Sequence, residues 1–358
     1  MRRIEFHNRE KELKEIRDIL DTEPSLITFV YGPVNSGKTA LITHLIEQLP
    51  ENYVVFYVNL RGKFISSYDD FVRALFKLDR EKKEYKEILK TISEVSLKSL
   101  KFTGIPITEG VLDLFFREKT YDDVFEFLED YFTEIAENKV PVLIVDELQK
   151  IGDVRINTHL IYELFNLFIR LTKELHLCHV FAVTSDSLFI KRVYSEAMLS
   201  ERCKYLLADD FDYETTIAFL DHYGFDMHER EIAWHYVGGK PVSLVRLINE
   251  KRSEKNIEEV AGSMLKLRTG EIGQRTKVLK IVNKKILFEK DEMELKYDDV
   301  TKILDKFSDE ESYTYDVITP EITYLVKENI LFVDPVNCII KPQSRLNLLA
   351  IREILENA

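Results

Sequence analysis

Residues 25–39, SLITFVYGPVNSGKT, decide the fold of this 358-residue chain. Their first part, SLITFVYG (25–32), is a short apolar run with β-branched and aromatic residues that closes on a glycine, which predicts a buried strand. GPVNSGKT (32–39) then fits the pattern G-x-x-x-x-G-K-[ST] at every fixed position, and a helix is expected from Lys38. This order of strand, glycine-rich loop and helix predicts a loop that binds phosphate groups through its backbone N–H groups.

Each part of this phosphate loop (residues 32–39) has an expected task. Lys38 is expected to reach the β- and γ-phosphates of a nucleotide, and the Thr39 hydroxyl to bind Mg²⁺. A glycine-rich turn that arose by chance is the alternative, and the correct order of strand, loop and helix argues against it. The expected nucleotide contacts are Gly32, Pro33, Val34, Asn35, Ser36, Gly37, Lys38, Thr39 and Ala40.

Another apolar run ends in two carboxylates. VLIVDE (142–147) places Asp146 at the end of a buried strand, where it is expected to hold Mg²⁺ through water. Glu147 follows directly and is expected to orient and deprotonate an attacking water molecule. The simpler alternative is a loop that exposes two acids to solvent. After the next strand, Thr184 and Ser185 are expected either to sense the γ-phosphate or to cap a turn.

The chain divides into three expected parts, and the first is an α/β core over residues 1–213. Its strands alternate with helices, which predicts a parallel sheet with helices on both faces. Residues 61–138 are expected to be a mostly helical insertion in this core, and the aromatic stretch 115–132 a core face rather than a base-stacking platform. The core strands are expected at 25–32, 53–60, 140–147, 178–186 and 203–211.

The second part, residues 214–272, is expected to be a helical lid, with one continuous helix over 244–268. The third part, residues 273–358, combines helical patterns with two short strands about a turn, which is typical of a winged-helix-like domain. Its helices are expected at 275–287, 299–307 and 319–330, and its hairpin at 331–342.

Composition narrows the class of protein. The chain has 50 Lys and Arg against 63 Asp and Glu, a net charge of −13, which disfavours general binding to nucleic-acid backbones. It has no run of 18 apolar residues and no signal-peptide pattern, and its three cysteines are widely spaced. A cytoplasmic protein is therefore expected. The charged share of 32% is typical of a thermophile.

Several motifs together resemble the archaeal ATPase family, in the STAND branch of AAA-type P-loop NTPases. They are FHNRE (6–10), GPVNSGKT, LIVDE, a strand ending in TSD, and VGGKP (237–241). The resemblance implies that Asn8 and Arg9 lie near the adenine, and that Pro241 packs on the nucleotide. A helix stop followed by a helix start is the alternative for VGGKP. The absence of an N-K-x-D motif also favours adenine over guanine.

The family resemblance also implies an arginine before the last sheet strand. This chain has Glu201-Arg202 where the family usually has Gly-Arg. Arg202 matches the family's arginine and is the expected cation for the γ-phosphate, with Arg192 as its competitor. Either arginine is equally well explained as a surface cation beside acidic residues.

These expectations favour an Mg²⁺-dependent ATPase that acts as a switch, in which ATP binding closes the lid and the tail on the core. A protein partner is expected to bind the insertion or the C-terminal domain. The alternative is a nucleotide-dependent DNA-binding regulator, although residues 271–358 contain more acids than bases and Glu321 and Glu328 outnumber Lys327 on the expected recognition helix. A small-molecule kinase is weaker still, because Glu147 beside Asp146 suits attack by water.

Overall fold

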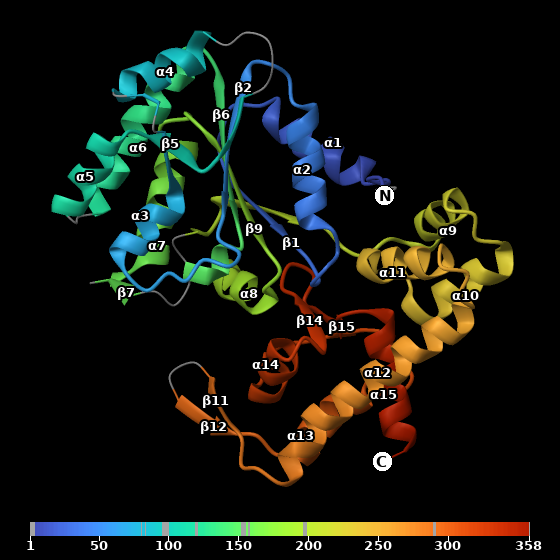
Figure 1. Ribbon diagram of the computed structural model, residues 1–358. Coiled ribbons are helices and arrows are strands. Elements are labelled where there is room, and N and C mark those ends of the chain that lie inside the picture. Colours follow the sequence, from blue (N-terminus) through green and yellow to red (C-terminus); the bar gives the residue numbers. More distant parts are fainter. Residues whose placement is uncertain are drawn as a thin grey trace.

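A parallel six-stranded sheet forms the centre of the first part of the molecule (Figure 1). The computed structural model describes residues 4–79, 81–82, 84–94, 100–118, 121–151, 155–156, 158–195, 199–288 and 291–357. In spatial order the strands are β10 (Cys203–Leu207), β1 (Ile27–Tyr31), β9 (His179–Thr184), β6 (Val140–Asp146), β2 (Tyr53–Asn59) and β4 (Leu100–Thr103). All five pairings are parallel, as the alternating pattern predicts.

Helices cover both faces of this sheet because both faces of its strands are apolar. Every residue of β1 and β9 is buried. On one face, α1 (Glu10–Leu20) and α2 (Lys38–Gln48) pack on the sheet. The other face is covered by α6 (Tyr121–Ala136), α7 (Leu160–Ile169) and α8 (Ser187–Ser195). Because its strands are parallel, the carboxyl ends of β1, β6 and β9 lie together at one end of the sheet.

The segment 61–138 is less helical than its composition predicts. Its β4 adds a strand to the sheet beside β2, and β3 pairs with β5. The expectation of a mostly helical insertion missed these strands because each is only three or four residues long. The aromatic stretch does form a core face, with Phe115 and Tyr131 buried. The elements are α3 (Tyr68–Leu75), β3 (Phe76–Leu78), α4 (Tyr85–Glu94), β4, β5 (Ile105–Ile107), α5 (Glu109–Glu118) and α6.

Short elements connect the later strands of the core. The helix that precedes β9 begins at α7 and ends in a π-helical turn. These connecting elements are the 3₁₀ turn η1 (Leu148–Ile151), β7 (Arg155–Ile156), β8 (Thr158–His159) and the π-helical η2 (Arg170–Glu174).

Four helices follow the core, and the expected continuous helix over 244–268 is wrong. The chain breaks at residues 252–256, where the Asn256 side chain accepts a hydrogen bond from the Glu259 N–H and begins a new helix. That helix, α12, runs across the expected boundary at residue 272. The four helices are α9 (Tyr213–His222), α10 (Met227–Val237), α11 (Pro241–Lys251) and α12 (Ile257–Lys277).

The C-terminal part combines helices with two small antiparallel sheets. The helix expected at 275–287 is wrong, because α12 ends at Lys277 and a 3₁₀ turn, η4 (Val278–Lys280), leads into a hairpin. The hairpin expected at 331–342 is present and pairs with β13. The winged-helix assignment stays a prediction. The elements are β11 (Lys285–Phe288), β12 (Asp291–Glu294), α13 (Tyr297–Asp305), β13 (Tyr313–Thr314), α14 (Pro320–Lys327), β14 (Leu331–Asp334), β15 (Ile339–Pro342) and α15 (Arg345–Glu356).

The C-terminal part docks on the sheet edge that carries the phosphate loop. Figure 1 shows the red strands β14 and β15 beside the blue loop that follows β1. The buried Tyr31 hydroxyl donates to Asp334 Oδ1 at 2.7 Å, and the Val333 N–H donates to Ser187 Oγ at 3.3 Å. Over the described residues, the helices are all too short or too polar to span a membrane.

Candidate functional site

The phosphate loop turns sharply between β1 and α2. Gly37 has φ 94°, a left-handed conformation that favours glycine. Gly32 lies so close to the chain after β10 that a Cβ atom there would come within 2.2 Å of the Ala208 carbonyl oxygen. Glycine is therefore required at both fixed positions of the motif, once for backbone conformation and once for close packing.

Lys38 lies at the centre of this loop. Its Nζ donates to the carbonyl oxygens of Gly32 at 3.0 Å and Pro33 at 2.8 Å. Burial, followed by the nearby positive charge of Lys240, lowers the Lys38 pKa to about 8. An ammonium group in so dry a place attracts an anion strongly, because little water screens its charge.

Thr39 and Asp146 come together although 107 positions separate them. The Thr39 hydroxyl lies 3.3 Å from Asp146 Oδ2, and the Tyr57 hydroxyl donates to the same oxygen at 2.6 Å. Burial raises the Asp146 pKa. Hydroxyl and carboxylate oxygens are the hard ligands that Mg²⁺ prefers, with the rest of its shell from phosphate and water. The donor set fits one Mg²⁺ ion, held by Thr39 and Asp146.

Glu147 is fixed by a chain of polar contacts. Its backbone has φ 63°, which is uncommon for a non-glycine residue and typical of functional positions. Arg61 Nη2 donates to Oε1 and Gln149 Nε2 to Oε2, both at 2.6 Å. Thr184 Oγ1 donates to Gln149 Oε1 at 2.7 Å and accepts from the Asp186 N–H, which fits the capping of a turn, whereas γ-phosphate sensing stays a prediction.

The N-R-E segment places its two polar residues differently. Arg9 Nη2 donates to the carbonyl oxygens of Ser36 and Asp209, each at 2.6 Å, and so ties the phosphate loop to the chain after β10. Its guanidinium also lies over the Phe211 ring. Asn8 instead donates to Thr215 at the start of α9. Arg9 is therefore at the phosphate loop, whereas Asn8 joins the N-terminal segment to the lid.

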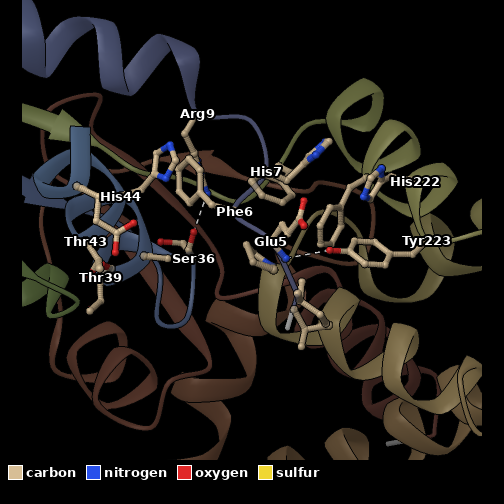
Figure 2. A pocket seen from close by; sticks show the side chains of 18 of the residues that line it. Glu5, Phe6, His7, Arg9, Ser36, Thr39, Thr43, His44, His222 and Tyr223 are labelled. Atoms are coloured by element: carbon tan, nitrogen blue, oxygen red, sulfur yellow. Dashed lines mark hydrogen bonds between the residues drawn. The ribbon is translucent and has the colours of Figure 1, made fainter. Parts of the chain in front are cut away.

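A cavity of about 1450 Å³ opens between the phosphate loop and the lid. Figure 2 shows aromatic side chains on both sides of it, with Phe6 and His44 near the loop and His222 and Tyr223 across from them. Phe6 and His44 stack with ring centroids 4.0 Å apart. Pro241 also lines the cavity. Flat apolar walls beside a phosphate loop suit a nucleobase.

The VGGKP segment reaches the phosphate loop through two of its residues. Pro241 begins α11 and lies about 3.9 Å from the position that a Gly37 Cβ would occupy. Buried Lys240 donates to the Val34 carbonyl oxygen at 3.1 Å and pairs with Asp210 at 2.9 Å. A Cβ on Gly239 would lie 1.8 Å from the Phe211 carbonyl oxygen. This glycine therefore allows contact with the chain after β10.

Arg202 is not brought into this site. It directly precedes β10, at the amino end of the sheet, whereas the phosphate loop follows the carboxyl end of the neighbouring β1. At about 3.3 Å per residue, the length of β10 separates the two on the order of 16 Å. Arg192 is exposed on α8, with its guanidinium 5.6 Å from the Phe189 ring.

Comparisons with known proteins agree with this geometry. The family described as an ATPase domain predominantly from Archaea matches residues 6–247. The chain belongs to this archaeal ATPase family. A second family, described as the C-terminal domain of the MJ1010-like uncharacterized ATP-binding protein, matches residues 258–355.

Relatives of this archaeal ATPase match it over nearly its whole length. A protein of Methanocaldococcus jannaschii, described as an uncharacterized ATP-binding protein, is 47% identical over 99% of this chain and 98% of its own. A Pyrococcus abyssi protein with the same description is 45% identical over 98% of this chain and 99% of its own.

Two solved structures share the fold. The Walker-type ATPase PABY2304 of Pyrococcus abyssi has a TM-score of 0.65 at 16% identity and covers 98% of this chain and 97% of its own. The ORC2 protein of Aeropyrum pernix, in its ADPNP–ADP complexes, has a TM-score of 0.51 at 12% identity over 99% and 94% of the two chains.

Several contacts of this archaeal ATPase were missed by sequence reasoning. The aromatic pair Phe6–His7 directly precedes N-R-E, and its position beside that motif was an available signal. By contrast, Gln343 lies more than 300 residues from the loop, and no spacing rule reaches it. Its Oε1 accepts a hydrogen bond from the Val34 N–H at 3.1 Å, and the nearby Lys341 pairs with Asp209.

Proposed function

We propose that this archaeal ATPase binds ATP with Mg²⁺, hydrolyses it, and uses the nucleotide state to control how its lid and C-terminal part dock on the core, as a STAND-type switch. One observation carries the proposal. The phosphate loop contacts the lid through Lys240 and the C-terminal part through Gln343, within the loop's own first residues. Relatives described as ATP-binding proteins support the choice of nucleotide.

The chemistry follows from the placement of each group. Lys38 binds β- and γ-phosphate oxygens, and Thr39 with Asp146 would hold Mg²⁺, which would neutralise phosphate charge. Glu147 accepts a proton from a water molecule whose oxygen bonds to the γ-phosphorus. The bond from that phosphorus to the β–γ bridging oxygen breaks, which leaves ADP and inorganic phosphate. Arg61 and Gln149 orient the Glu147 carboxylate for this step.

The switch follows from competition for one donor. The Val34 N–H donates to Gln343 in the structure, and it belongs to the loop that receives the γ-phosphate. An ATP γ-phosphate that accepts from Val34 removes this contact, whereas ADP leaves it intact. A ligand shifts a conformational equilibrium only through such contacts that differ between the two states.

The test separates binding from chemistry with two variants. Lys38→Ala should weaken ATP binding and abolish turnover, because the phosphate charge loses its cation. Glu147→Gln should still bind ATP with Mg²⁺, but hydrolyse it about 10²–10⁴-fold more slowly, the usual contribution of a general base. Calorimetry and phosphate release are the measurements, and exposed Glu137→Gln is the matched control. Parent-like turnover in Lys38→Ala would remove the phosphate-loop assignment.

The DNA-binding alternative receives little support from the charges. The helix expected to read DNA, α14, has residues 322–326 buried. In the basic cluster at 275–285, Arg275 and Lys284 both pair with Glu328, and Lys285 pairs with Glu292. Cations already neutralised within the protein release few counterions from DNA. The division at residues 213 and 272, the winged helix and the cytoplasmic location stay proposals.

A further inference from the structure

We propose that Lys327, at the end of α14, is the cation that binds the γ-phosphate from the C-terminal part. This proposal rests on the proposed function, because it needs ATP in the phosphate loop. It gives the site the cation that Arg202 cannot supply, and it lets the C-terminal part distinguish ATP from ADP directly.

The first observation is a second cavity, of about 320 Å³, which is lined by other residues of the phosphate loop than the aromatic cavity. Val34 and Asn35 of the loop line it, together with Glu147. The core also contributes Arg61 and residues 185–188, and the C-terminal part contributes Lys327 and Gln343. The expected base, the outer half of the loop and a lysine from a distant segment therefore face one small space. That is where a γ-phosphate and its attacking water would lie.

The second observation is which charged side chains of this cavity already have partners. Arg61 already pairs with Glu147 at 2.6 Å, so these two charges compensate each other. Asp186 accepts hydrogen bonds from two N–H groups at the start of α8. Among the described residues, Lys327 has no ion pair. Of the described cations that line this cavity, Lys327 is thus the one without an ion-pair partner.

The third observation is that the neighbouring acid is already occupied. Glu328 pairs with Lys284 at 2.9 Å and with Arg275 at 3.4 Å, and so does not neutralise Lys327. The Tyr324 hydroxyl donates to the Arg275 carbonyl oxygen at 2.7 Å. These contacts and the buried residues 322–326 fix α14 within the C-terminal part, and α14 also contacts α8, whose first residues line the cavity. The end of the helix is therefore held at the cavity, and only the flexible lysine side chain has to move.

The consequence is specificity for the third phosphate. A γ-phosphoryl group brings negative charge into this cavity, and an ammonium donor there is stabilising. Negative charge also develops on the transferred group during hydrolysis, so the same contact lowers the barrier. ADP ends at the β-phosphate on the Lys38 side, and its affinity should not depend on Lys327.

The experiment compares ADP with a non-hydrolysable ATP analogue, both with Mg²⁺, by calorimetry on the full chain. Lys327→Gln should weaken analogue binding about tenfold or more, the loss expected for one charge-assisted hydrogen bond. ADP binding should stay within about twofold. Single-turnover hydrolysis should fall about 10²–10³-fold, as for loss of one preorganised donor. Lys327→Arg should restore most of both. Exposed Lys266→Gln, on α12, is the matched control.

Two results would overturn the proposal. Unchanged analogue binding and hydrolysis in Lys327→Gln would show that the lysine does not reach the phosphate. An equal loss for ADP and for the analogue would show that Lys327 acts only through domain packing. If the parent protein binds neither nucleotide, both the proposed function and this inference are wrong. If the parent prefers the analogue and the Lys327→Gln variant keeps this preference, only the Lys327 contact is wrong.

Discussion

Single charged residues set the phosphate loop apart from the rest of this acidic chain. Lys38 and Lys240 are both buried beside it, and each lowers its own cost of burial with nearby oxygens. Lys240 has Asp210 as its partner, whereas the partners of Lys38 among the described residues are backbone carbonyls and the Ser36 hydroxyl. Lys38 is therefore the lysine that gains most from an incoming phosphate.

The Lys38 pKa of about 8 predicts a pH dependence for nucleotide binding. Phosphate favours the charged lysine, so binding above pH 8 should take up a proton. Since only the protonated fraction binds well, Mg-ADP affinity should be about tenfold lower near pH 9 than near pH 7. Calorimetry in two buffers of different ionisation enthalpy measures this uptake. Lys38→Arg keeps its charge throughout and should flatten the profile. A pH-independent parent would contradict the assignment.

At the scale of elements, the turn between α10 and α11 joins the lid to the core. The Phe211 N–H donates to the Gly239 carbonyl oxygen at 2.9 Å, and Lys240 and Pro241 then contact the phosphate loop. The turn works only if two backbone segments touch. A glycine at 239 is therefore a packing requirement, independent of any bound nucleotide.

Two glycine-to-alanine variants should shift stability in opposite directions. Gly239→Ala forces its Cβ onto the Phe211 carbonyl and should destabilise the fold by about 1–3 kcal/mol, as overpacking does. Gly262→Ala, inside α12 with open space around it, should stabilise by up to about 1 kcal/mol through helix propensity. Denaturant unfolding followed by circular dichroism measures both. If both variants changed the free energy of unfolding equally, the turn at Gly239 would accommodate the added methyl group at no cost, contrary to this prediction.

At the scale of the whole molecule, the nucleotide site lies where three parts meet. In the proposed site, the core supplies Lys38, Asp146 and Glu147, the lid supplies Pro241, and the C-terminal part supplies Gln343. The exposed break at 252–256 separates α11 from α12, the helix that runs from the lid across residue 272 into the C-terminal part. Because the two helices are not continuous, we expect movement of the tail to occur at this break.

Limited proteolysis at this break measures how firmly the C-terminal part docks on the core. Gln343→Ala removes the contact with Val34, so trypsin should cut at Arg252 and Lys255 faster than in the parent. The difference between the ADP and ATP-analogue forms should also shrink, because one nucleotide-sensitive contact is gone. Gln274→Ala, exposed on α12, is the matched control. Identical cleavage of the parent in both nucleotide states would leave a plain ATPase without a switch.

The sequence alone determined the parts of this site that are local. GPVNSGKT combines its turn, its cation and its hydroxyl within eight residues, and VLIVDE combines a buried strand with the acids at its end. The periodicity of apolar residues and the composition suffice to predict the conformation of such segments, because this conformation depends on neighbours along the chain. The order of strands and helices likewise predicted the parallel sheet, and the motifs of the chain indicated the resemblance to the archaeal ATPase family.

Only the tertiary structure decided which distant residues complete the site. Arg202 matched a family position, yet the direction of β10 places it at the opposite end of the sheet. Gln343 and the proposed Lys327 show no local signal, because their positions depend on how the C-terminal part packs on the core. Packing between segments hundreds of residues apart is set by surface shape and buried area, which spacing along the chain does not encode.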